Sequence, residues 1–307
     1  MLVSVVAMFQ FAGSARAISP PKGISLSPFS QEVKLQQGDV EKSFSLTITN
    51  HTTVIQELSL STKDFGSLND TGGIILEGTK NYSQKYGLAS WLTLERDTVT
   101  LQPEESTTVL ATIDNRASLQ PGGHYGAIVA TIGSLDPTPN NHVVINQQLL
   151  SLVLVDKIGG EHYDLKLVSA HQNGNWLHLP NDVTLRFQNP GNVHVIPRGI
   201  VKLISPGGRV VAQGIINDES AYLLPETFRE MHVNLTPVGK GLPLPGTYHV
   251  QVQYRYDGLQ HFGTKNFTSV FINLKGNLIL LLVLIVAVWR VRKYSAQKSS
   301  KKTAKTK

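Results

Sequence analysis

The sequence has no cysteine among its 307 residues, and charged residues make up only 16% of it. The absence of cysteine excludes a disulfide framework, a thiol nucleophile and a cysteine-ligated metal site. Low charge combined with 41% hydrophobic residues excludes disorder driven by charge excess for most of the chain. At roughly 100–200 residues per domain, the length predicts about two domains.

Acidic residues are missing from the C-terminal end, where Asp257 is the last one. Eight cations lie in the final segment: Arg290, Arg292, Lys293, Lys298, Lys301, Lys302, Lys305 and Lys307. The formal charge of +6 therefore becomes 6 − 8 = −2 for residues 1–289. The sequence consequently predicts no nucleic-acid partner, since such a partner needs a basic face on the folded part.

Catalytic fingerprints are also missing from the sequence. There is no G-x-S-x-G elbow, P-loop or dinucleotide motif, and the ten histidines never fall at metal-ligand spacing. We therefore expect no catalytic residue, no cofactor and no metal site. A hydrolase with an unrecognised site is kept as a minor alternative.

The N-terminal residues read as an export signal. Residues 2–12 are apolar but too short to span a bilayer, and Ala15-x-Ala17 is a small-residue cleavage pattern. This predicts a signal peptide over residues 1–17, although a basic n-region is absent. A buried first strand or an uncleaved anchor is the alternative.

The C-terminal apolar run predicts a membrane anchor. Gly276 to Trp289 is 14 residues without a charge, and flanking cations could extend it by snorkelling. We expect a transmembrane helix over 275–291 that contacts lipid, a cytoplasmic tail over 292–307, and extracellular domains. The anchoring residues would be Leu278, Leu282, Ile285, Trp289, Arg290, Arg292 and Lys293. A buried core helix is the alternative.

Between these ends, apolar and polar residues alternate in strand-like runs. Phe44-x-Leu46-x-Ile48, Val183-x-Leu185-x-Phe187 and Val250-x-Val252-x-Tyr254 are three such runs. This period of two predicts strands with one apolar face, as in antiparallel sandwiches. No helical stripe interrupts them.

The sequence contains an internal duplication. Each half has a strand that ends in Asn (Asn50, Asn189), then a Pro-Glu corner, then Pro-Gly followed by Tyr. The distance from the Asn to the Pro of the Pro-Glu corner is 53 in the first half (50 to 103) and 36 in the second (189 to 225). The first half therefore carries about 17 extra residues, which we place in the segment 66–90.

These patterns predict an all-β protein with two tandem immunoglobulin-like antiparallel sandwiches and one C-terminal transmembrane helix. The first domain would cover 18–158 and the second 159–274. Trp91 and Trp176 stand beside alternating apolar residues and are expected to pack in the cores.

The order of these features resembles the WxL-interacting surface proteins of Gram-positive bacteria and, more loosely, the immunoglobulin-like half of pilus chaperones. The residues that carry the resemblance are Trp91-Leu92-x-Leu94, Pro103-Glu104 and Pro121-Gly122-x-His124-Tyr125-Gly126. The resemblance implies that the first sandwich binds peptidoglycan and the second binds partner proteins.

The segment 66–90 is the candidate binding region. Exposed aromatic rings beside polar groups suit a glycan face, and this segment holds Asp70, Asn81, Tyr82 and Tyr86. The alternative is a loop whose tyrosines pack onto their own sheet.

The sequence thus favours a non-enzymatic surface protein of the cell membrane that binds cell-wall glycan or another surface protein. The alternative function is a membrane-tethered assembly chaperone for exported subunits. It would hold a strand and a carboxylate in a basic cleft between the sandwiches, and Arg186, Arg198 or Lys202 could supply the charge.

Overall fold

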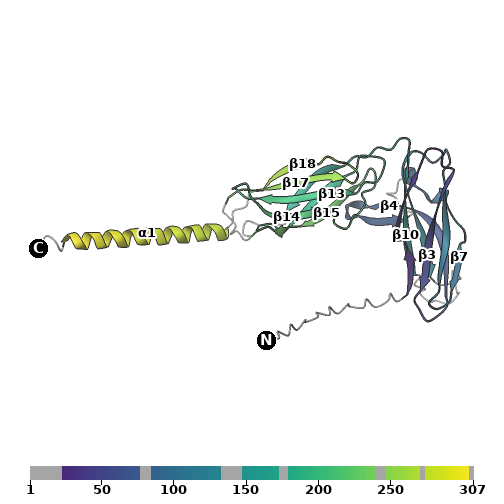
Figure 1. Cartoon of the computed structure of the whole chain (residues 1–307), viewed down its shortest axis with the longest axis horizontal. Coiled ribbons are helices and arrows are strands. Elements are labelled where there is room, and N and C mark those ends of the chain that lie inside the picture. The colour runs from purple at the N-terminus through teal and green to yellow at the C-terminus, as the bar shows by residue number, and fades with distance from the viewer. Residues whose placement is uncertain are drawn as a thin grey trace, which may run out of the picture.

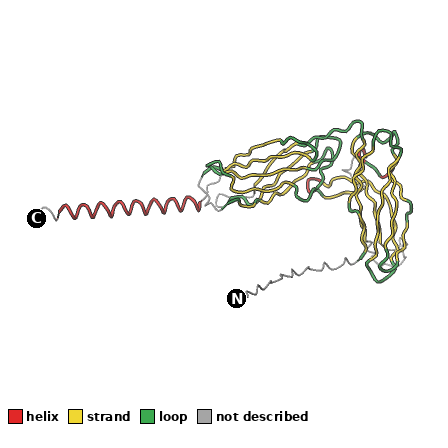
Figure 2. Tube along the Cα trace, viewed as in Figure 1, coloured by secondary structure: helices red, strands yellow, loops and turns green. Residues whose placement is uncertain are grey.

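The protein is mostly β-sheet with a single C-terminal helix (Figures 1 and 2). The computed structural model describes residues 23–76, 84–132, 147–172, 179–239, 246–269 and 274–303. The predicted Ala15-x-Ala17 cleavage site and Trp176 therefore lie outside the described residues. Figure 1 shows two groups of strands that meet at a bend, followed by the extended helix.

The first group of strands forms two facing sheets. One sheet has the order β1-β3-β8-β6, and the other has the order β2-β10-β9-β4-β5, with β7 pairing the start of β4. The strands of the first sheet are β1 (Ile24–Ser27), β3 (Glu41–Asn50), β6 (Leu92–Leu94) and β8 (Ser106–Asp114). Those of the second sheet are β2 (Ser30–Leu35), β4 (Gln56–Leu68), β5 (Gly73–Leu76), β7 (Thr98–Leu101), β9 (Gly122–Ile132) and β10 (Gln147–Lys157).

The second group repeats this arrangement with fewer strands. A three-stranded sheet, β11-β12-β15, faces a five-stranded sheet, β16-β14-β13-β17-β18. The first sheet holds β11 (Lys166–Gln172), β12 (Asp182–Gln188) and β15 (Phe228–Asn234). The second holds β13 (Pro197–Ile204), β14 (Val210–Ile216), β16 (Thr236–Pro237), β17 (Tyr248–Tyr256) and β18 (Gly263–Ser269).

The alternating residues supply the cores, which confirms the all-β prediction. Leu46 and Ile48 of β3 are fully buried between the first pair of sheets. Leu185 and Phe187 of β12 pack against Val252 of β17 in a single cluster between the second pair. Trp91 is half-buried against the first core.

The duplicated asparagines make nearly the same hydrogen bonds. The Asn50 amide donates to the carbonyls of Val54 (2.8 Å), Leu101 (3.2 Å) and Gln102 (3.0 Å). The Asn189 amide donates to the carbonyls of Val193 (2.7 Å) and Leu223 (3.0 Å). Each side chain therefore ties the end of its strand to the loop that follows and to the segment before the Pro-Glu corner.

Helix α1 (Leu274–Thr303) corrects one prediction. Its uncharged run from Gly276 to Trp289 covers roughly 21 Å at 1.5 Å per residue, which is short of the roughly 30 Å of a bilayer core, and Arg290 follows at once. Within the described part of the chain, no helix is long and apolar enough to cross a membrane. The prediction of a single-pass protein, with 275–291 in the bilayer, extracellular domains and a cytoplasmic tail, is therefore wrong.

The anchor residues named from the sequence all lie on α1. The side chains of Leu278, Leu282, Ile285 and Trp289 are exposed there. Lys293 Nζ lies 5.0 Å from the centroid of the Trp289 ring.

Candidate functional site

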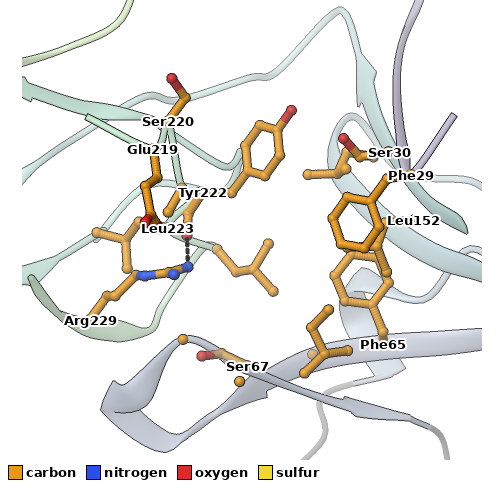
Figure 3. Close-up of a pocket in the computed structure, with 17 residues that line it drawn as sticks. Phe29, Ser30, Phe65, Ser67, Leu152, Glu219, Ser220, Tyr222, Leu223 and Arg229 are labelled. Carbon is orange, nitrogen blue, oxygen red and sulfur yellow. Dashed lines mark hydrogen bonds between the residues drawn. The ribbon is translucent and has the colours of Figure 1, made fainter. Parts of the chain in front are cut away.

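A cavity of about 440 Å³ lies between the two sandwiches. Figure 3 shows Phe29, Phe65 and Leu152 on one side of it, with Glu219 and Arg229 on the other. The first side belongs to the outer face of the sheet that contains β10, and the second belongs to the segment before β15 and to β15 itself. The cavity therefore has an apolar wall from one sandwich and a partly charged wall from the other.

The apolar wall follows from the direction of alternate residues along β10. Val153 and Val155 point into the first core, whereas Leu152 and Leu154 point outward and join Phe65, Tyr86 and Tyr125 in a separate buried cluster. Phe29, which directly precedes β2, is 67% exposed at this wall. A ring exposed to this degree on an otherwise apolar surface is what a partner would cover.

The charged wall is centred on Arg229 of β15. Its Nη1 donates a hydrogen bond to the carbonyl oxygen of Tyr222 at 2.7 Å, and burial lowers the pKa of its guanidinium. A methyl group added to Gly72 of the first sandwich would lie 2.3 Å from Arg229 Cζ. The guanidinium is therefore held between a glycine of one sandwich and a carbonyl of the other.

A joint between the sandwiches lies next to Tyr222, which lines the cavity. The backbone N–H of His194 donates to Tyr125 Oη at 2.7 Å, and the His194 ring lies edge-on to Tyr125 and Tyr222. His194 Nε2 is 3.6 Å from Glu32 Oε1. The Gly123 N–H donates to the Asn192 carbonyl at 2.8 Å.

Tyr125 is the tyrosine that follows the first Pro-Gly. It lies in the buried cluster on the outer face of the sheet, where only 1% of it is exposed. Burial raises the pKa of its hydroxyl well above the ordinary value, so this hydroxyl is neutral and available to accept the His194 hydrogen bond.

Beside the cavity, β10 has an unpaired edge. β2 pairs with β10 only from Leu152 to Lys157, although β10 begins at Gln147. Since the Leu152 N–H donates to the Phe29 carbonyl (2.9 Å) and backbone groups alternate along an antiparallel strand, Gln148 and Leu150 direct their N–H and C=O groups to the same side. No described strand pairs with this part of β10 on that side. We call Gln147–Ser151 the free edge.

The candidate binding residues of segment 66–90 are only partly described. Asn81 and Tyr82 lie outside the described residues. Asp70 accepts from Arg186 Nε at 2.6 Å, and Tyr86 is buried, with 8% of its surface exposed. Their proposed role in glycan binding stays a prediction.

The cations proposed for a basic cleft lie away from the cavity wall. Arg186 contacts Asp70, Arg198 lies 3.2 Å from Asp257, and Lys202 donates to the Gln253 amide oxygen at 3.1 Å. None of the three lines the cavity. Arg229 is the cation there, and the sequence analysis missed it because no local pattern separates it from Arg186, which lies in the adjacent strand β12.

No described group of three His, Asp or Glu side chains could hold a metal ion. A second, smaller cavity of about 120 Å³ lies beyond the joint, lined by Glu32, Asp156, Tyr163, His194 and Asp257, among others. Asp156 accepts a short hydrogen bond from Tyr163 Oη.

Comparison with known proteins gives similarity in structure only. No family model and no curated protein matches the sequence. A chain from a chaperone–tip adhesin complex of CFA/I fimbriae biogenesis is 13% identical, with a TM-score of 0.42 and coverage of 81% of this chain and 98% of that one. The class 5 fimbriae chaperone CfaA is 14% identical (TM-score 0.38, 81% and 99% coverage) and the E. coli chaperone DraB is 14% identical (0.36, 81% and 97%).

The neighbours thus include a fimbrial chaperone, the class of protein named in the looser of the two resemblances drawn from the sequence. The resemblance to WxL-interacting surface proteins is not confirmed and stays a prediction.

Proposed function

We propose that this protein is an assembly chaperone that holds an extended segment of a partner protein as an added strand on the free edge of β10. The observation that carries this proposal is the partial pairing of β10, which β2 covers only from Leu152 onward. A segment that pairs with Gln148 and Leu150 would use main-chain hydrogen bonds, which accept many sequences. Such tolerance suits a protein that serves several subunits.

The apolar wall of the cavity supports the same function. A strand added to the free edge would extend the sheet, so its outward side chains would lie beside Leu150 and toward Phe29 and Leu152. Exposed strand edges and apolar rings invite uncontrolled pairing, and a chaperone can use both to cover the same features on an unassembled subunit. The partner would be an exported protein subunit with alternating apolar residues.

Enzymatic activity is not part of this proposal. Ser25 Oγ lies 3.0 Å from His51 Nε2, and Thr184 Oγ1 lies 3.0 Å from His232 Nδ1, but neither pair lines the cavity. The adhesive function favoured by the sequence gains no support from the described residues, since Asp70 is in an ion pair and Tyr86 is buried. The formal charge of −2 over residues 1–289 also leaves nucleic acid outside the proposed partners.

The test uses fluorescein-labelled synthetic peptides of alternating apolar and polar residues, titrated with the full-length chain and followed by anisotropy. Leu150→Pro removes the N–H that faces the free edge and leaves the pairing of β10 with β9 in place. The loss of one strand hydrogen bond and the ring clash should weaken binding by about tenfold, or ~1.4 kcal/mol. Leu150→Val is the matched control, because it changes the side chain and keeps the N–H.

Peptides N-methylated at single positions provide the second arm. Strand addition predicts loss of binding at alternate positions only, since alternate N–H groups face β10. If the peptides fail to bind, or if binding is indifferent to both Leu150→Pro and the methylation pattern, the strand-capture function is wrong. Urea unfolding of each variant verifies that the fold is intact.

A further inference from the structure

The hairpin of β4 and β5 reaches from the first sandwich to the second. β4 pairs with β9 up to Asp64 and then continues, pairing with β5 from Phe65 to Leu68. The turn between them is the short helix η1 (Asn69–Thr71). In Figure 1 the far end of β4 points toward the second sandwich. This hairpin falls in the segment where the first half of the duplication carries its extra residues.

The tip of the hairpin contacts β12 and β15 at two points. Asp70 Oδ2 and Arg186 Nε form an ion pair at 2.6 Å, with 34% and 31% of the side chains exposed. The same guanidinium lies 4.0 Å above the Phe228 ring, which fixes its position for Asp70. Two residues later, Gly72 lies against the Arg229 guanidinium.

Gly72 is suited to this contact for two reasons. Its φ of +76° is in the left-handed region, which other residues adopt at a cost. Any Cβ would also come within 2.6 Å of Arg229 Cζ, Nη2 and Nε. A side chain at position 72 would therefore displace Arg229 from its place beside the Tyr222 carbonyl.

The hairpin is also part of the cavity wall. Gly66, Ser67 and Ile74 line the cavity, and Figure 3 shows Ser67 on the ribbon that runs below Arg229. The joint at Tyr125 and His194 ties the sandwiches elsewhere on the same interface. The hairpin tip and this joint are thus two of the attachments beside the cavity, and the ion pair of Lys85 with Glu226 at 2.7 Å is a third.

We propose that residues Phe65–Leu76 form an interdomain strap that fixes the angle between the two sandwiches and holds Arg229 in the cavity. Asp70 and Gly72 are the positioning residues of this strap. The strap itself does not depend on the proposed function. Only its effect on partner binding rests on that function: if the strap opened, the two walls of the cavity would move apart beside the free edge.

The absence of cysteine permits a direct test. Cysteines introduced at the exposed positions Thr93 of β6 and Gln213 of β14 place one spin label on each sandwich. Pulsed electron paramagnetic resonance then measures the distance distribution in the full-length chain. The wild-type background should give a narrow distribution. Asp70→Asn and Gly72→Val should each broaden it and shift its maximum.

The controls separate the strap from general loss of stability. Asp114→Asn removes an ion pair of 2.7 Å with Arg116 inside the first sandwich and should leave the distribution narrow. Asp70→Glu keeps the charge and should restore the narrow distribution. If Asp70→Asn and Gly72→Val leave it unchanged in folded protein, the strap does not exist.

Peptide binding distinguishes the two proposals. Broadening in the strap variants together with no peptide binding by the wild type supports the strap and removes the proposed function. Peptide binding without broadening supports the function and removes the strap.

Discussion

The backbone N–H of His194 donates to the hydroxyl of Tyr125 at 2.7 Å, across the boundary between the two sandwiches. The acceptor comes from β9 and the donor from the loop between β12 and β13, 69 residues further along the chain. The hydroxyl is buried, so water cannot replace it. This bond therefore links the stability of the second sandwich to a side chain of the first.

Tyr125→Phe should therefore destabilise the protein while preserving the ring contacts. It leaves the His194 N–H without its acceptor, at a cost of about 1–3 kcal/mol. The measurement is the free energy of unfolding in urea. Tyr294→Phe, at a tyrosine that is 71% exposed, should stay within about 0.5 kcal/mol of the wild type. Equal effects of the two substitutions would contradict the role given to Tyr125.

Asn50→Ala and Asn189→Ala should each be strongly destabilising. Both side chains are fully buried. Each removal takes away an amide donor to at least two carbonyls and the acceptor of one backbone N–H, that of Thr52 or Gly191, so we expect a loss of roughly 2–4 kcal/mol. Urea unfolding followed by far-ultraviolet circular dichroism measures it. Gln213→Ala, at an exposed position of β14, is the control. If either substitution lowered the free energy of unfolding by less than the control does, the repeated asparagine would not stabilise the fold.

Phe29 and Phe65 line the same cavity. Substituting Phe65 should lower stability, whereas substituting Phe29 should weaken peptide binding. Phe65→Ser empties a position that is 3% exposed and should cost about 3–5 kcal/mol. Phe29→Ser alters a ring that is 67% exposed and should change stability by less than about 0.5 kcal/mol. Its effect should appear in the peptide titration as weaker binding. Unchanged binding with Phe29→Ser would exclude this ring from the partner surface.

The contribution of Glu32 to the free energy of unfolding, through the interdomain joint, should depend on pH. The neighbouring His194 is the main reason that the pKa of Glu32 lies below its ordinary value, so its carboxylate stabilises the folded state above the unfolded pKa of about 4.3. That contribution is lost as the pH falls through the lowered folded pKa. The difference in unfolding free energy between wild type and Glu32→Gln should be positive at neutral pH and shrink toward zero in acid. A difference that grows on acidification would reverse this sign and contradict the assignment.

The strands could be predicted from the sequence because their signal is local. Phe44, Leu46 and Ile48 alternate with polar residues, and the structure places all three on one face of β3. The asparagine at the end of each repeated strand was found in the same way. The same order of Asn, Pro-Glu and Pro-Gly in the two halves is accompanied by similar hydrogen bonds of the two asparagines.

The site could not be found in this way. Asp70 and Arg186 are 116 residues apart, and neither has a neighbour that marks it as an interface residue. The tyrosines of the 66–90 segment drew attention because of their type, whereas the glycine beside them, Gly72, makes the closest contact with Arg229. The membrane prediction was wrong because the uncharged run from Gly276 to Trp289 is too short. The prediction counted the flanking cations as part of the span, although these cations mark where the apolar run ends.

Glu104 and Glu226 occupy the same place in the duplicated Pro-Glu corner, with φ angles of 60° and 58°. Glu104 is exposed and forms no ion pair with a described residue, whereas Glu226 contacts Lys85 Nζ at 2.7 Å. One copy of the corner only turns the chain, while the other attaches to the preceding module. The two modules are therefore not interchangeable. Only the second copy of the corner contacts the other module, so exchanging the order of the two modules would remove this ion pair.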